Sequence, residues 1–459
     1  MTIHQYIPNS SSETKKRMLE EIGTSSAEDL FADVPERIRH RKKLNLPQSK
    51  SEYEVRRHVE SLLARNKTSS ELTSFLGAGC WPHHVPAVCD EINSRSEFLT
   101  AYAGDPYTDL GRYQALFEFQ SMIGELVAMD VVSFPWYDWG TIAGDAVRMA
   151  LMITGRNEVL VPRTISPDRL SVLHTYCDGQ AEIKLISNHP ETGQLSPKDL
   201  EGKISSKTAA VYIENPTYLG FIETSVEEIS QTAHKHGALF IAGVEPLSLG
   251  ILTPPGEYGA DIVCGEGQPL GMHTYYGGAL LGFLACRDDE KLVAAVPHRL
   301  VTITKTEREG EWGFCYVLPE RTMFAARDKA RSFTGTATAL WAITAAVYMS
   351  LLGPQGMRDL AETIMARSHY AMKRLSEIKG LKVPVFNAPC FEEFTVNYDA
   401  IGRPVQEINK TLLGDGIVGG KDVSKEFPEL GNTSLFCITE IHTKRDIDKL
   451  ATALQEAVR

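Results

Sequence analysis

Glu158-Val159-Leu160-Val161-Pro162 and Glu182-Ile183-Lys184-Leu185-Ile186 are the two short, mostly apolar runs that decide the fold. Each run predicts a strand, and the segment from Ser166 to Cys177 between them predicts a helix. The alternation continues along the chain, with a helix expected over 226–236 and strands over 209–213, 238–242, 261–264 and 278–284. Short apolar strands that alternate with helices predict a mostly parallel, doubly wound sheet covered on both faces.

The two ends of the chain differ from this central region. The first 75 residues predict helices, because Ser25 with Glu28 and Ser51 with Glu54 both have the spacing of a capping box. Beyond a Gly-Pro-Gln-Gly turn expected at 353–356, strands are expected over 383–386, 393–396 and 434–438. We therefore predict an N-terminal helical arm (1–75), a large α/β domain (76–352) and a small C-terminal α+β domain (353–459).

Composition excludes several classes of protein. The 459 residues carry a net charge of −12, from 47 Lys and Arg against 59 Asp and Glu, so nothing draws the chain to nucleic acid or to an anionic membrane. No stretch of about 18 apolar residues is present, and the first residues have no signal-peptide pattern. The eight cysteines are scattered without a Cys-x-x-Cys pair. We expect a cytoplasmic protein with reduced thiols.

Three segments are candidates for binding. Gly140 and Thr141 precede a helical stretch, where free N–H groups bind anions, although an ordinary helix start explains them as well. His83-His84 has no acidic residue at metal-ligand spacing, which favours a loop pair and no metal site. The glycines of 265–271 follow a predicted strand but match no nucleotide-binding motif. The basic run 39–43 is expected to be a solvated arm or a partner contact.

Several motifs together resemble one family. They occur in order along nearly the whole chain, at 44–47 (LNLP), 74–79 (SFLGAG), 84–88 (HVPAV), 94–102 (SRSEFLTAY), 254–263 (PPGEYGADIV), 265–271 (GEGQPLG) and 347–354 (VYMSLLGP). They are similar to subunit 1 of the two-chain glycine decarboxylase, the P-protein of the glycine cleavage system. The resemblance implies the fold type I architecture of pyridoxal-phosphate-dependent transferases, in which two related chains pair with the active site at their interface.

The resemblance also implies partners and an activity. The family releases CO₂ from glycine on pyridoxal phosphate and passes the aminomethyl group to the lipoyl arm of the H-protein, so the cofactor acts as an electron sink. Such an enzyme is expected to be a heterodimer or an α2β2 heterotetramer of this chain with a homologous subunit 2.

This chain lacks the residues that would hold the cofactor. The chemistry requires a lysine for a Schiff base and an acid near the pyridine nitrogen. No lysine occurs between His236 and Glu290, Ala242 stands where the fold usually has its aspartate, and Glu245 falls past the expected strand end. The resemblance therefore implies that subunit 2 holds pyridoxal phosphate, that Gly140 and Thr141 are vestigial, and that this chain has no catalytic residue of its own.

Two segments depart from the family pattern, 103–111 and 333–336. By the pairing of the fold, the first of them reaches toward the partner's active site. Tyr102, Asp105, Tyr107 and Gln114 are the candidates for lining a composite site, and Asp105 for orienting a substrate ammonium group or a proton. Interface packing is the alternative role for each.

Two other hypotheses remain open. The departures are also compatible with a non-catalytic paralogue whose pyridoxal-phosphate partner acts on another substrate. A self-sufficient homodimer would need a lysine elsewhere, and Lys291 and Lys305 are the nearest candidates. Lys291 follows the hydrophilic run 287–290, which favours a solvated surface position for it.

Overall fold

The computed structural model describes two compact units, Met1–Lys67 and Thr68–Arg459. Within them, the described residues are 6–8, 10–40, 42, 44–69, 71–99, 112–278, 280–330 and 337–459. The predicted boundaries at residues 75 and 352 stay a prediction.

The first unit consists of short helices. They are α1 (Ser12–Ile22), α2 (Glu52–Leu63) and two 3₁₀ turns, Ala27–Phe31 and Glu36–Ile38. The capping box of Ser51 with Glu54 is confirmed, whereas the one expected at Ser25 is wrong by one residue. Ser26 caps the first 3₁₀ turn instead, and Asp29 reaches back to its N–H. None of these helical residues is buried.

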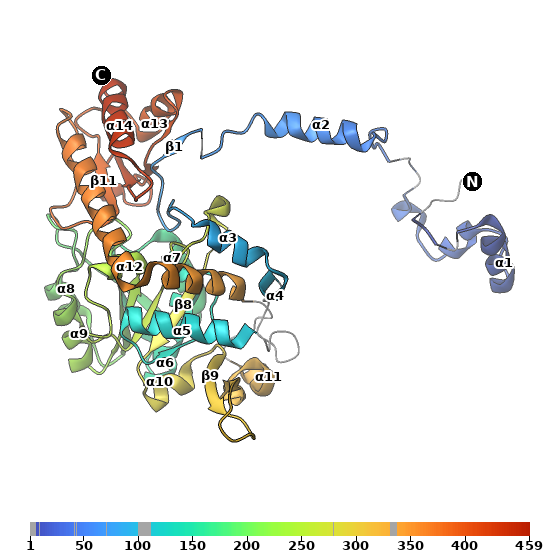
Figure 1. Cartoon of the computed structure of the whole chain (residues 1–459), viewed down its shortest axis with the longest axis horizontal. Coiled ribbons are helices and arrows are strands. Elements are labelled where there is room, and N and C mark those ends of the chain that lie inside the picture. The colour runs from blue at the N-terminus through green and yellow to red at the C-terminus, as the bar shows by residue number, and fades with distance from the viewer. Residues whose placement is uncertain are drawn as a thin grey trace. The chain divides into compact units, whose positions relative to one another are not determined.

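A seven-stranded sheet forms the centre of the second unit (Figure 1). In spatial order its strands are β2 (Val131–Val132), β8 (Gly282–Cys286), β7 (Ile262–Glu266), β6 (Leu239–Val244), β5 (Thr208–Glu214), β3 (Glu158–Pro162) and β4 (Glu182–Ile186). The five strands from β7 to β4 are parallel to one another, and β8 runs antiparallel to them. Strand β2 pairs antiparallel with β8 and therefore runs in the same direction as the five. The predicted mostly parallel sheet is confirmed.

Helices cover both faces of this sheet, because successive strand residues point to opposite sides. Phe240 and Ala242 belong to one hydrophobic cluster and Ile241 to the other. The first cluster includes residues of α5 (Tyr113–Val127), α8 (Pro197–Lys203), α9 (Val226–Lys235) and α12 (Ala339–Ser376). The second includes residues of α6 (Trp139–Thr154), α7 (Pro167–Cys177) and α10 (Glu290–Ala295).

Smaller elements complete this part of the chain. They are α3 (Ala87–Ser94), α4 (Ser96–Leu99), α11 (Met323–Ala326) and the antiparallel hairpin of β9 (Leu300–Lys305) and β10 (Trp312–Val317).

The C-terminal region has its own core around a three-stranded antiparallel sheet. Its elements are β11 (Glu393–Asn397), β14 (Thr433–Cys437), β13 (Lys421–Asp422), α13 (Val405–Gly414) and α14 (Lys444–Ala457), and β1 (Thr73–Ser74) pairs with β12 (Ile417–Val418) beside them. The strands expected at 393–396 and 434–438 are confirmed. The one at 383–386 is wrong, since Pro384 has no N–H to donate to a ladder and this segment forms bends.

Helix α12 contains a sharp kink where the sequence predicted a turn. Gly353 has φ 62° and ψ −179°, a conformation open essentially to glycine alone, and Pro354 follows it. The expected interruption between two helical stretches is therefore confirmed at Gly353, and α12 consists of two helical segments on either side of it. No helix in the described part of the chain, α12 included, is long and apolar enough to span a membrane.

We expect Gly353→Ala to lower the free energy of unfolding by about 1–3 kcal/mol, because a Cβ strains this backbone conformation. Urea denaturation measures the effect. Gly202→Ala in α8 is the control, since its added Cβ meets no atom within 4 Å and alanine favours a helix. Equal midpoints for the two variants would contradict the proposed strain.

Candidate functional site

The N-terminus of α6 is capped by a side chain of this chain. Asp138 Oδ1 accepts a hydrogen bond from the Thr141 N–H at 2.7 Å, and the Thr141 hydroxyl accepts one from the Asp138 N–H at 3.3 Å. A Cβ on Gly140 would lie 3.2 Å from Asp138 Oδ1. Gly140 and Thr141 thus lie at the helix start as predicted, but a carboxylate already occupies the place where an external anion would bind.

A second carboxyl group, that of Glu266 at the end of β7, meets the same helix start. Its Oε2 accepts from the Trp139 N–H at 3.2 Å, and its Oε1 accepts from the N–H groups of Gln268 (3.0 Å) and Leu281 (2.6 Å). Burial raises the pKa of Glu266 to about 8, although the three donors favour the charged form. The start of α6 therefore faces two internal carboxyl groups.

The indole ring of Trp139 fills the space between α6 and β6. A Cβ added to Gly243 of β6 would lie 2.8 Å from the indole, and Trp139 itself is 3% exposed. Ala242 stands at the position where the fold usually has an aspartate. It belongs to the hydrophobic cluster on the opposite face of the sheet. Gly243 thus lies on the same side of β6 as Ile241, toward α6, and its lack of a side chain leaves room for the Trp139 ring.

A buried ion pair lies over this ring. Arg169 Nε and Nη2 donate to Glu214 Oε1 and Oε2 at 2.5 and 2.8 Å, and the guanidinium carbon is 4.0 Å from the centre of the Trp139 ring. Burial alone would lower the pKa of Arg169, but Glu214 reverses this and holds it above its usual value. The Tyr212 hydroxyl donates to Glu214 at 3.1 Å. Bidentate pairing and stacking hold this guanidinium in place.

These groups line a pocket of about 330 Å³, here called the α6-start pocket, together with the glycine-containing loop 77–80. Its titratable groups are Asp138, Asp168, Glu266 and Arg169; burial keeps a proton on Glu266 near neutral pH, and the arginine is already paired with Glu214. The balance is acidic, which disfavours a dianion such as a phosphate group.

His83 lies at the centre of a second, buried acidic cluster. Its Nδ1 is 2.8 Å from Glu440 Oε2 and its Nε2 is 3.5 Å from Glu392 Oε2. The predicted loop pair is confirmed, since His83 and His84 precede α3, and the His84 N–H donates to Glu440 Oε1 at 2.6 Å. Among the described residues no set of three or more His, Cys, Asp or Glu side chains is arranged for a metal ion.

Burial shifts the carboxyl groups of this cluster in one direction. It raises the pKa of Glu393 to about 7, and it raises those of Glu392 and Glu245 as well. Glu440 is the exception: burial favours a rise in its pKa, but the contact with His83 holds the value below normal. Glu245 lies past the end of β6, as predicted, and accepts from the Leu247 and Ser248 N–H groups. The cluster holds protons near neutral pH.

Only one of the four residues predicted to line a composite site is among those that the structure describes. Tyr102, Asp105 and Tyr107, together with the segment 333–336, are outside the residues that the structure describes. Gln114 is on the exposed side of α5, where its amide donates to Glu118 Oε1 at 3.0 Å. Their roles stay predictions.

The alternative lysines are both exposed. Neither Lys291 nor Lys305 lines the α6-start pocket, and Lys305 Nζ lies 5.8 Å from the centre of the Trp312 ring.

Sequence reasoning missed Arg169, Glu214 and the adjacent acids Glu392-Glu393. The acids left a signal, because Glu393 opens β11 directly after Glu392, and a carboxyl group that enters a buried strand requires a partner or a proton. Arg169 left none, since an arginine in an amphipathic helix is ordinarily solvated.

Comparisons with known proteins agree across the whole chain. The sequence model of the glycine cleavage system P-protein family matches residues 4–454. A probable glycine dehydrogenase (decarboxylating) subunit 1 from Staphylothermus marinus is 42% identical over 467 residues, covering 100% of this chain and 99% of the relative. A crystal structure of a glycine decarboxylase (P-protein) of the glycine cleavage system, in inhibitor-bound form, matches with a TM-score of 0.84 and 34% identity, covering 99% of this chain and 100% of that one.

A more distant structure bears on the fold alone. Glutamate decarboxylase from Lactobacillus brevis has a TM-score of 0.69 at 12% identity, covering 94% of this chain and 97% of that one. The expected fold type I α/β architecture is confirmed.

We expect Arg169→Met to lower the free energy of unfolding by about 3–5 kcal/mol, because it leaves the Glu214 carboxylate buried without its partner. Adding Glu214→Gln to that variant is expected to restore much of the loss. Chemical denaturation of the two single variants and the double variant gives the coupling energy. A double variant as unstable as Arg169→Met would show that the ion pair is not the cause.

Glu393 predicts a pH dependence of stability. The unfolded carboxyl group ionises above about pH 4.5 while the folded one keeps its proton to about 7, so stability falls as pH rises between these values. Glu393→Gln keeps an acceptor for the Ala78 N–H and removes the titration. The variant is expected to match wild type near pH 4.5 and to exceed it at pH 8 by about 3 kcal/mol.

Denaturation midpoints measured from pH 4.5 to 8 test this dependence. The control is Glu429→Gln, which changes an exposed carboxylate and is expected to run parallel to wild type. A Glu393→Gln curve that also runs parallel to wild type would contradict the prediction.

Proposed function

This chain belongs to the glycine cleavage system P-protein family, and on that premise we propose that it is subunit 1 of a two-chain glycine dehydrogenase (decarboxylating). The observation that carries the proposal is similarity from end to end with relatives that bear this name, at 42% identity and 99% coverage of the relative. These relatives are named subunit 1, which supports a second subunit as the partner of this chain. The complex acts on glycine and passes the aminomethyl group to the lipoylated H-protein.

We propose that the second subunit holds pyridoxal phosphate, because the residues of this chain do not fit the cofactor. Where its phosphate would bind, Asp138 and Glu266 already accept the N–H groups at the start of α6. Where its ring would lie over β6, the Trp139 indole stands against Gly243, with Arg169 stacked on it. No lysine occurs between His236 and Glu290 to anchor the cofactor.

The role that remains for this chain is structural support of a composite site. Tyr102, Asp105, Tyr107 and Gln114 are the proposed lining residues, with Asp105 orienting the substrate ammonium group. The side chains packed at the start of α6 favour this supporting role. The Arg169–Glu214 pair, the Trp139 ring and the Glu266 carboxyl group are all buried there, so they make this region rigid while they occupy the space that the cofactor would need. We propose that the complex is located in the cytoplasm.

The test compares this chain alone, the second subunit alone and the two together with lipoylated H-protein. Exchange of labelled bicarbonate into the carboxyl group of glycine is expected only when all components are present. After borohydride reduction in the presence of pyridoxal phosphate, mass spectrometry is expected to find the adduct on the second subunit alone.

Two outcomes contradict the proposal in different ways. An adduct on a lysine of this chain, whether Lys291, Lys305 or another, would show that this chain holds the cofactor. Full exchange by the second subunit without this chain would show that the active site is not composite.

A further inference from the structure

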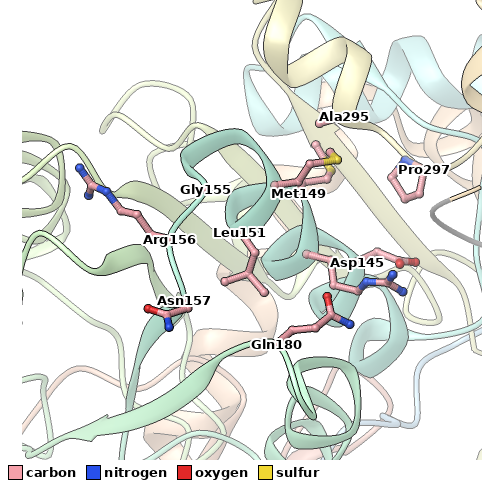
Figure 2. A pocket seen from close by; sticks show the side chains of 11 residues that line it. Asp145, Met149, Leu151, Gly155, Arg156, Asn157, Gln180, Ala295 and Pro297 are labelled. Carbon is pink, nitrogen blue, oxygen red and sulfur yellow. The ribbon is translucent and has the colours of Figure 1, made fainter. Parts of the chain in front are cut away.

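A second pocket, here called the distal pocket, opens beside the C-terminal half of α6. Its volume of about 470 Å³ suits a small organic ligand. It is bounded by α6, by the turn that precedes β4 and by the segment after α10 (Figure 2). None of its lining residues lines the α6-start pocket, so the two belong to opposite ends of one helix.

The distal pocket offers a cation and an anion one helical turn apart. Asp145 and Arg148 lie three residues apart on α6 and therefore share a face. Arg148 is half-buried, and over the described part of the chain its guanidinium has neither a hydrogen bond nor an ion pair. Such a group in a pocket favours a carboxylate, which guanidinium binds bidentately.

Asp145 is built into the floor of this pocket. It is 2% exposed, and its Oδ2 lies 3.0 Å from His298 Nε2. The His298 ring in turn packs against Trp136 in a tilted arrangement, with ring centres 3.8 Å apart and 40° between the ring planes. The other oxygen, Oδ1, has no hydrogen bond to any residue that the structure describes. Oδ2 lies against the His298 ring without a hydrogen bond to it, and both carboxylate oxygens are left with the capacity to accept from a donor.

The other arginine of the pocket is already engaged. Arg156 Nη1 donates to the carbonyl oxygens of Thr208 and His236 at 2.8 and 2.9 Å. Figure 2 shows its guanidinium pointing away from Asp145 and Leu151, whereas the Gln180 side chain reaches toward them. One guanidinium and one carboxylate are therefore left to contact a ligand.

The remaining wall is apolar. Met149 and Leu151 of α6 are 1% and 9% exposed, and Ala295 and Pro297 face them from across the pocket. Met152 of the same helix also lines the pocket. An unbranched thioether adapts to the shape of an apolar ligand.

We propose that the distal pocket binds a free α-amino acid with an apolar side chain. Arg148 binds its carboxylate, Asp145 Oδ1 accepts from its ammonium group, and the side chain packs against Met149, Leu151 and Pro297. A zwitterion satisfies both charged groups at once, which a simple anion or a simple cation does not. This site is independent of the α6-start pocket and of the proposed glycine chemistry.

Isothermal titration of L-leucine into the full chain, and into its complex with the second subunit, tests the proposal. Saturable binding is expected in both. Leucine amide, which lacks the carboxylate, and 4-methylpentanoic acid, which lacks the ammonium group, are each expected to bind at least tenfold more weakly. Glycine, which lacks the apolar side chain, is also expected to bind more weakly than leucine.

Arg148→Gln is expected to weaken leucine binding at least tenfold, with unchanged circular dichroism. Arg163→Gln is the control, because Arg163 is exposed and outside the pocket, and it is expected to bind as wild type does. The proposal is overturned if leucine gives no saturable heat, if Arg148→Gln binds as wild type, or if 4-methylpentanoic acid binds as tightly as leucine. Binding to the chain but not to the complex would also overturn it, since the partner would then cover the pocket. Glycine exchange plays no part in these readouts, so failure here leaves the proposed function untouched.

Discussion

The carboxyl group of Glu266 reaches from the end of β7 to three backbone N–H groups, those of Trp139, Gln268 and Leu281. These donors belong to three segments, the start of α6, the turn after β7 and the entry to β8. A buried carboxyl group costs free energy unless its acceptors are filled, so the contacts hold the segments in a single arrangement. In this arrangement the α6 backbone, which in other settings would bind an external anion, is satisfied from within.

The neighbouring side chains follow from that constraint. With the helix start held, the Trp139 ring lies over Gly243, and the Arg169 guanidinium lies over the ring and pairs with Glu214. Residue 243 has to be glycine here, because any larger side chain would meet the indole. An aromatic ring and an ion pair of the chain itself thus fill the space between α6 and β6.

The loop that precedes α3 connects this region to the C-terminal sheet. Gln268 accepts from the Trp81 N–H at 3.0 Å and donates to its carbonyl oxygen at 3.1 Å. The Ala78 N–H donates to Glu393 of β11, and His83 lies between Glu392 and Glu440. Polar groups far apart in the sequence therefore meet within this small volume, and several of the carboxyl groups keep a proton because they are buried.

The sequence by itself determined the alternation of strands and helices, the capping of α2 and the family, because each depends on neighbouring residues or on contiguous motifs. The strands at 158–162 and 182–186 were predicted to the residue. The strand at 383–386 failed for a local reason, since a proline cannot donate to a ladder. Whether Ala242 or Gly243 lies on the α6 side of β6 was not predictable in this way: adjacent residues of any strand point to opposite faces, and only the packing of α6 on the sheet decides which face it covers. Likewise, only the tertiary structure brings Glu266 to Trp139, 127 residues earlier, and Arg169 to Glu214, 45 residues later. Contacts over such separations depend on the order of strands in the sheet, which no local pattern encodes.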